Sequence, residues 1–131
     1  MENCIFCKIV KGQISSYKVF KDENFFAFLD IHPASPGHTL LIPKKHIRWV
    51  HDVEPFDKYW EVARIIMRKL DMALDPQWIQ YFVHGAIPHA HIHIIPRYDD
   101  VTTAQDLLQQ SGVTSSNEEL AEVAEKIRQT A

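Results

Sequence analysis

The run His89-Ala90-His91-Ile92-His93-Ile94-Ile95 alternates imidazole and apolar side chains at successive positions. Residues two apart in a β-strand point to the same face. The run therefore predicts a strand over 89–95, closed by prolines on both sides, with three imidazoles in a row on one face. Ala90, Ile92 and Ile94 then occupy the other face, which we expect to lie against the core. The chain has to build a sheet that can accommodate both faces.

Two chemistries are open for such a row. A single histidine in a strand is usually partly exposed and has no special role, but three of the chain's eight histidines in strict alternation argue for a site. Histidine is the side chain that titrates near neutral pH. Two histidines on one strand face can also converge on a single zinc ion. The row therefore indicates either a metal site or phosphate chemistry.

The other segments predict an α+β domain. Short apolar runs bounded by Pro, Gly, Asn or Asp indicate further strands over 17–20, 25–29, 38–42 and 78–83. The Glu54-Pro55 step opens a long helix that ends at Asp75-Pro76, and its apolar stripe is Phe56, Trp60, Ala63, Met67, Leu70 and Leu74. Two more helical patterns begin at about Thr103 and about Asn117, the second with a capping box of Ser116 and Glu119.

Several ordered motifs resemble the histidine triad (HIT) family of nucleotide hydrolases and transferases. These are the triad itself, Cys4-Ile5-Phe6-Cys7-Lys8-Ile9, Ala27 through Asp30-Ile31, Ser35-Pro36-Gly37-His38-Thr39 and Ile42-Pro43-Lys44-Lys45-His46. The resemblance spans about Cys4 to Arg97 and is weaker in the last 30 or so residues. It implies a HIT-like fold, an antiparallel five-stranded sheet with one long helix plus short N- and C-terminal helices. We expect a single domain over 1–131, with its core over about 4–98 and a helical extension over 99–131.

A neutral imidazole is a good nucleophile at pH 7, because its usual pKa is about 6.5. The resemblance places this role on His91, which would attack the α-phosphate of a nucleotide and form a covalent nucleotidyl intermediate. His93 would hydrogen-bond the phosphate and favour its developing charge. His38 matches a fourth family histidine that orients the triad.

The same resemblance implies a nucleoside site. Asp30 would accept hydrogen bonds from the ribose hydroxyls, and the apolar walls around the base would come from Phe6, Ile9, Phe28 and Ile31. Gln80 lies near where members often have an asparagine on the phosphate side. The segment 80–88 is shorter than in many members, like the short-loop bacterial branch, and holds no serine or threonine that could assist a leaving group. The leaving group stays open, and adenosine is the expected nucleoside from the family.

Cys4 and Cys7 are the chain's two cysteines, and their C-x-x-C spacing suits half of a tetrahedral zinc site. Some branches of the family complete a structural zinc site with two histidines, which here are His46 and His89. That set would leave His91 and His93 for phosphate. The alternative is a pair of unligated thiols in a reducing cytosol. A thioredoxin-like redox role would need a preceding strand, which the chain start does not offer.

Composition limits the partners. A net charge of −3 gives no reason to expect nucleic-acid or anionic-membrane binding, and the basic segment 44–48 is typical of a solvated turn. No apolar run approaches the roughly 20 residues that span a bilayer, and the first residues do not resemble a signal peptide, so we expect a cytoplasmic protein.

An unpaired sheet edge and apolar helix surface, including Trp60 or Val62, predict a homodimer. The alternative function is a non-catalytic nucleotide-binding, zinc-stabilised interaction module.

Overall fold

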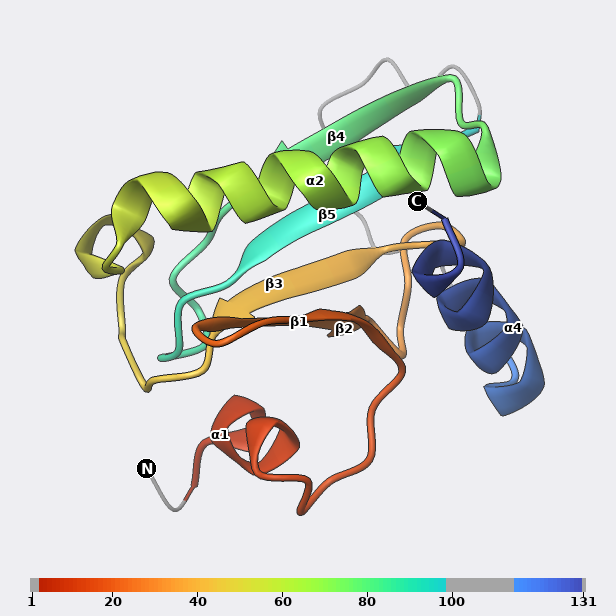
Figure 1. Cartoon of the computed structure of the whole chain (residues 1–131). Coiled ribbons are helices and arrows are strands. Elements are labelled where there is room, and N and C mark those ends of the chain that lie inside the picture. Colours follow the sequence, from red (N-terminus) through yellow and green to blue (C-terminus); the bar gives the residue numbers. More distant parts are fainter. Residues whose placement is uncertain (1–2, 99–114, 131) are drawn as a thin grey trace.

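The computed structural model describes residues 3–98 and 115–130, so the helical pattern expected from about Thr103 lies outside the described residues. Five strands form one antiparallel sheet in the order β1-β2-β3-β5-β4 (Figure 1). Their bounds are Lys18–Lys21 for β1, Phe25–Leu29 for β2, Thr39–Pro43 for β3, Trp78–Phe82 for β4 and Ile92–Arg97 for β5. The expected α+β class and the five-stranded antiparallel sheet are confirmed.

Within residues 3–98 and 115–130, three α-helices accompany the sheet: α1 (Ile5–Val10), α2 (Phe56–Leu74) and α4 (Asn117–Arg128), with a short 3-10 turn, η1 (Val50–Asp52), ahead of α2. The long helix α2 lies across the sheet and α4 packs beside it, while α1 lies apart from both (Figure 1). The capping prediction for α4 is confirmed, because the Ser116 hydroxyl oxygen accepts from the Glu119 backbone N–H at 3.1 Å. The expected short N- and C-terminal helices are therefore present.

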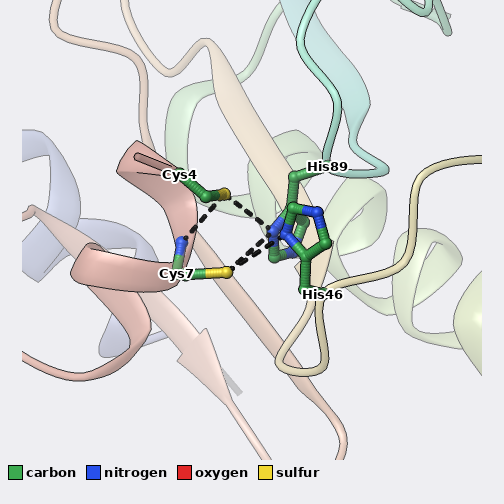
Figure 2. Close-up of side chains that lie close together, drawn as sticks. All are labelled: Cys4, Cys7, His46 and His89. Carbon is green, nitrogen blue, oxygen red and sulfur yellow. Dashed lines mark hydrogen bonds between the residues drawn. The ribbon is translucent and has the colours of Figure 1, made fainter. Parts of the chain in front are cut away.

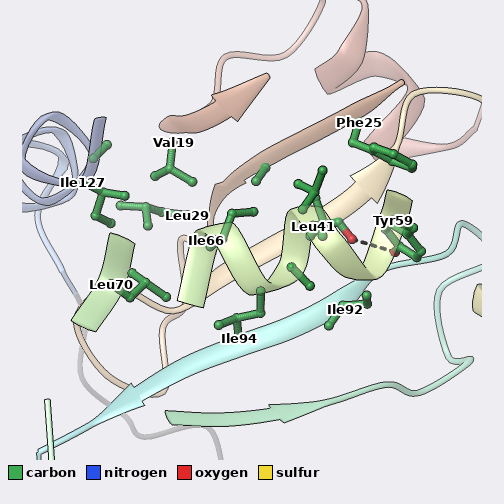
Figure 3. Close-up of a cluster of buried hydrophobic side chains, with 14 of the residues drawn as sticks. Val19, Phe25, Leu29, Leu41, Tyr59, Ile66, Leu70, Ile92, Ile94 and Ile127 are labelled. Carbon is green, nitrogen blue, oxygen red and sulfur yellow. Dashed lines mark hydrogen bonds between the residues drawn. The ribbon is translucent and has the colours of Figure 1, made fainter. Parts of the chain in front are cut away.

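The central strands β2, β3 and β5 are buried on both faces, and strand alternation divides their side chains between two clusters. One cluster packs under α2 and α4 and includes Phe25, Ala27, Leu29, Leu41, Ile92, Ile94 and Ile127 (Figure 3). The other packs under α1 and includes Phe26, Phe28, Leu40 and Ile42. Ala90, Ile92 and Ile94 belong to the first cluster, so the expected core face of the triad segment is confirmed.

The predicted stripe of α2 is wrong in part. The buried face of α2 consists of Tyr59, Val62, Ala63, Ile66 and Leu70, whereas Phe56 is exposed and Trp60, Met67 and Leu74 lie on the flank of the core. The Tyr59 hydroxyl donates to the Leu41 carbonyl oxygen at 2.9 Å, which sets the helix rotation (Figure 3). Val62, expected at the surface, is therefore buried.

The strand expected over 89–95 begins later and ends later than predicted. β5 is Ile92–Arg97, because its partner β4 stops at Phe82, opposite His93. Upstream, the Ala90 N–H donates to the Ile47 carbonyl oxygen instead of joining the sheet. Pro96, expected to close the strand, lies inside β5 opposite Ile79 of β4. On its other side β3 begins at Thr39, opposite Ile94, so no residue of β3 pairs with Pro96.

Candidate functional site

The three triad imidazoles enter two different environments at the start of β5. His91 and His93 line a cavity on the α1 side of the sheet. His89 instead directs its Nδ1 atom toward the thiols of Cys4 and Cys7. His89 is therefore placed for a metal site, whereas His91 and His93 are placed for phosphate chemistry.

His91 presents an unshared electron pair to the cavity. Its Nδ1 atom lies 2.8 Å from the carbonyl oxygen of His89, and because a carbonyl only accepts, Nδ1 must carry the proton. Nε2 of the neutral ring is then unprotonated, and no polar atom of residues 3–98 or 115–130 is within hydrogen-bond distance of it. An unprotonated imidazole nitrogen with a free lone pair is chemically able to act as a nucleophile.

A chain of hydrogen bonds fixes the tautomer of His93. The Ala34 N–H donates to His38 Nδ1 at 3.0 Å, so the His38 proton is on Nε2. That Nε2–H donates to His93 Nδ1, 2.9 Å away. The proton of neutral His93 must therefore be on Nε2, the atom that faces the cavity, where it can donate to an anionic oxygen.

Burial keeps these imidazoles uncharged. Burial first and Arg97 second lower the pKa of His38 to about 4. Burial, followed by the neighbouring His38, His91 and His84, lowers the pKa of His93 to about 3. Burial also lowers the pKa of His91, against an opposing hydrogen bond to the His89 carbonyl. Neutral rings are the state that a nucleophile and its donor partner need at pH 7.

We expect the free energy of unfolding to decrease as the pH falls from 7 to 5. His38 and His93 have folded pKa values of about 4 and about 3, below the unfolded value of about 6.5, so the unfolded chain binds more protons across this window. Each such proton contributes a loss of about 1.4 kcal/mol per pH unit. Burial raises the pKa of the Asp30 carboxyl, so the folded chain binds that proton more readily and Asp30 opposes the loss from the histidines as the pH falls.

Urea unfolding at closely spaced pH values measures this slope. His38→Asn should make it shallower, whereas His51→Ala, which removes an exposed imidazole outside the cavity, should leave it unchanged. A flat profile between pH 7 and 5 for the unmodified protein would contradict the assignment of neutral buried rings.

The cavity beside His91 has a volume of about 490 Å³, within the usual range for small-molecule sites. The four residues expected to wall the base all line it: Phe6, Ile9, Phe28 and Ile31. Phe6 also makes edge contacts with Phe28 and His91, at centroid distances of 5.6 and 5.3 Å. The cavity thus combines apolar walls with the imidazoles of His91 and His93.

Asp30 lines the same cavity at the end of β2. Its Oδ1 atom accepts from the His32 N–H at 2.9 Å, and its Oδ2 atom lies 3.7 Å from His38 Nε2. The side chain is 14% exposed and lines the cavity, and a carboxylate can accept further hydrogen bonds beside these two contacts. Such a carboxylate suits a pair of hydroxyl groups.

Gln80 is the one predicted site residue that the structure places elsewhere. It lies on β4, and its side-chain oxygen accepts from the Nε and Nη2 atoms of Arg97 at 2.9 and 2.8 Å. The cavity is lined by other residues. Gln80 therefore contacts Arg97, whose charge contributes to the lowered pKa of His38.

Cys4, Cys7, His46 and His89 converge from three separate parts of the chain (Figure 2). The Cys4 Sγ atom lies 3.2 Å from His89 Nδ1, and the Cys7 Sγ atom lies 3.2 Å from His46 Nδ1 and 3.5 Å from His89 Nδ1. Tetrahedral zinc with Zn–S of about 2.3 Å and Zn–N of about 2.0 Å separates S and N ligands by about 3.5 Å. The four side chains could therefore hold a metal ion.

The protonation of His89 also fits a metal. Its Nε2 atom lies 2.9 Å from the Pro43 carbonyl oxygen and must donate to it, so Nδ1, which faces the sulfur atoms, carries the lone pair. Metal-bound histidines commonly donate their second N–H to a backbone carbonyl in this way. Burial, assisted by Cys4, raises the pKa of the Cys7 thiol in the absence of a cation.

His84 belongs to the cavity but was missed from the sequence. It lies in the β4–β5 loop, lines the cavity, and its Nε2 atom is 3.0 Å from His93 Nε2. Alternation did not find it, because the loop is irregular. The sequence signal that could have indicated His84 as a site residue was its position in the short segment directly before the triad.

A five-stranded antiparallel sheet with imidazoles on one face and a long helix on the other defines the α+β class built on the HIT fold. Residues 11–100 match the HIT domain model, and the chain belongs to the HIT family. Protein hit of Bacillus subtilis is 41% identical over 74% of this chain and 72% of that protein. An adenosine 5'-monophosphoramidase of Candida albicans is 34% identical over 76% and 74%.

Solved structures agree. A Hit-like protein from Bartonella henselae superposes with a TM-score of 0.85 at 29% identity, covering 100% of this chain and 98% of that chain. A Zn-bound histidine triad family protein from Mycobacterium smegmatis superposes with a TM-score of 0.78 at 26% identity, covering 97% and 91%. The HIT resemblance of the sequence is thereby confirmed.

Proposed function

We propose that this protein is a nucleotide hydrolase or nucleotidyl transferase that cleaves at the α-phosphate through a covalent nucleotidyl-His91 intermediate. The observation that carries the proposal is the unpartnered Nε2 lone pair of His91 in the cavity. The names of related proteins, among them yeast adenosine 5'-monophosphoramidases, favour an adenosine substrate with a phosphoramidate bond.

In the first step, the His91 Nε2 lone pair forms a bond to the α-phosphorus. The bond from phosphorus to the leaving group breaks, and the leaving group departs with the electron pair and takes a proton from solvent. The ring of the intermediate is cationic, and its Nδ1–H still donates to the His89 carbonyl oxygen, which stabilises that charge. The His93 Nε2–H donates to a phosphoryl oxygen as charge develops.

In the second step, water attacks phosphorus, loses a proton to solvent, and the P–N bond returns its electron pair to His91. The nucleoside stays bound during both steps. Asp30 would accept from the ribose hydroxyls, while Phe6 and Phe28 pack against the base. Because different residues bind the nucleoside and react with the phosphate, a variant can lose turnover and still bind the nucleotide.

A panel of AMP derivatives tests the proposal. Amine phosphoramidates, a dinucleotide and a mixed acyl anhydride differ in leaving group, and AMP release is followed by chromatography. Rapid quenching without acid, then peptide mass spectrometry, should find one AMP unit on the peptide that contains His91. Release of no AMP from any derivative, with AMP still bound, would favour the non-catalytic module instead.

We propose that Cys4, Cys7, His46 and His89 hold one structural zinc ion. The chemistry of two thiols and two imidazoles at tetrahedral spacing supports this, as does the Zn-bound relative. Bound zinc would supply a cross-link and no reacting group. It joins α1 and the segment after β3 to the start of β5, and leaves His91 free. A reducing, cytoplasmic location would keep both thiols available.

We also propose that the chain forms one domain and pairs as a homodimer through α2 and the edge strand β4. Large apolar side chains are exposed along both elements: Phe56, Ile65, Met72 and Tyr81. Among residues 3–98 and 115–130, no helix is long and apolar enough to cross a bilayer. Light scattering at micromolar concentration should give twice 15.2 kDa, and a 15.2 kDa particle would contradict the pairing.

A further inference from the structure

His84 lies at the solvent side of the cavity, among the triad rings. Its side chain is exposed, whereas His91 and His93 are buried. Its ring centroid is 4.9 Å from that of His91 and 4.8 Å from that of His93. The loop that carries it also contributes Ala86 and Ile87 to the cavity, so this exposed loop forms part of the cavity wall.

A backbone contact fixes the tautomer of His84. The Ala86 N–H donates to His84 Nδ1 at 3.2 Å, so Nδ1 is unprotonated. The proton of the neutral ring is therefore on Nε2. This is the atom that lies 3.0 Å from His93 Nε2.

Two N–H groups consequently meet without an acceptor between them. The hydrogen bonds from Ala34 to His38 and from His38 to His93 put a proton on His93 Nε2. The contact from Ala86 puts a second proton on His84 Nε2. All four contacts cannot hold at once with neutral rings unless an acceptor takes both protons.

A cation would not resolve this conflict. The outer nitrogens of His84, His91 and His93 lie within 4.8 Å of one another, close enough for a metal. A metal, however, needs a lone pair from every ligand, and only His91 Nε2 offers one in these tautomers. The N–H groups of His84 and His93 can donate to the anionic oxygens of a phosphate, while the lone pair of His91 faces its electrophilic phosphorus.

We propose that His84 is a second phosphoryl-oxygen donor, which binds the oxyanion of the nucleotide together with His93. The inference rests on the proposed function and deepens it, because it assigns the short loop a role at the phosphate. His84 Nε2–H and His93 Nε2–H would donate to one anionic oxygen, while His91 faces the phosphorus. Preorganised donors of this kind stabilise charge in binding and in the transition state.

Calorimetric titration with AMP and with adenosine tests the inference. His84→Ala should weaken AMP binding by about 10- to 100-fold, the usual effect of losing a hydrogen bond to a charged group. Adenosine affinity should stay unchanged, because adenosine lacks the phosphate. His84→Gln, which keeps an N–H donor, should recover part of the loss, and His51→Ala should change neither affinity.

Nitrogen-15 spectra of the histidine rings supply a second readout. In the AMP complex, His38, His84 and His93 should all be protonated at Nε2 and unprotonated at Nδ1. Unchanged AMP affinity in His84→Ala, or an Nδ1–H tautomer of His84 in the complex, would overturn this inference alone. Normal AMP binding without any turnover would overturn the proposed function and leave the role of His84 standing, while unmodified protein that binds no AMP would overturn both.

Discussion

His91→Ala is expected to reduce turnover of an AMP phosphoramidate by about 10⁴-fold or more, since deletion of the nucleophile removes the whole stepwise route. AMP affinity should change little, because Asp30, the aromatic walls and His93 remain. Steady-state assays with a sensitive amine readout measure the first quantity, and calorimetry measures the second. Mass spectrometry of the His91→Ala variant should show no AMP adduct on the peptide that contains position 91.

His93→Ala provides the comparison for His91→Ala. It removes a donor and not the nucleophile, so the expected loss is about 10²- to 10³-fold. His38→Ala should also impair the reaction, because His38 fixes the tautomer of His93, while covalent attachment continues. Near-normal turnover in His91→Ala, or a stable adduct on His89 or His93, would show that the mechanism is wrong.

Cys7→Ser is expected to lose the metal and to lower the thermal unfolding midpoint by about 10 °C or more. The Cys7 Sγ atom contacts both His46 and His89, so its loss removes a ligand common to two segments. Structural zinc sites contribute about 10 kcal/mol or more in small domains, comparable to total protein stability. Elemental analysis should find about one zinc per unmodified chain and much less in the variant.

Lys8→Ser is the matched control for Cys7→Ser, because it changes the neighbouring residue of α1 without removing a ligand. It should keep the metal and nearly all of the stability. Turnover in Cys7→Ser should fall only as far as the fold is lost. If chelation stopped turnover at once while circular dichroism stayed unchanged, the metal would be catalytic and the assignment of His46 and His89 would be incorrect.

The alternation of the triad was enough to predict two faces of one segment, because side-chain direction in extended backbone depends on local geometry alone. The separate environment of His89 could not follow from alternation. It depends on where α1 and the segment after β3 place their sulfur and imidazole groups. Resemblance to the family supplied that part.

Tertiary contacts explain the wrong part of the predicted α2 stripe and also the position of Gln80. Apolar periodicity located α2 correctly, but the predicted apolar face is rotated from the buried one. The helix carries apolar residues on two adjacent faces, and the face that packs on the sheet is the one that includes Tyr59, whose hydroxyl donates to the Leu41 carbonyl oxygen. Gln80 was placed by its position before the triad, yet strand pairing turns it toward Arg97. His84 escaped notice because irregular loops have no period.

Phe6 stands between the two cysteines in sequence and contacts the rings of both His89 and His91, at centroid distances of 5.7 and 5.3 Å. One short helix thus supplies two thiols and one wall of the nucleoside pocket. If α1 is anchored by zinc, ion occupancy and nucleoside affinity are thermodynamically linked, and the linkage is reciprocal. A bound nucleotide would then raise the affinity of the site for the ion, and depletion of the ion would weaken nucleoside affinity by the same factor.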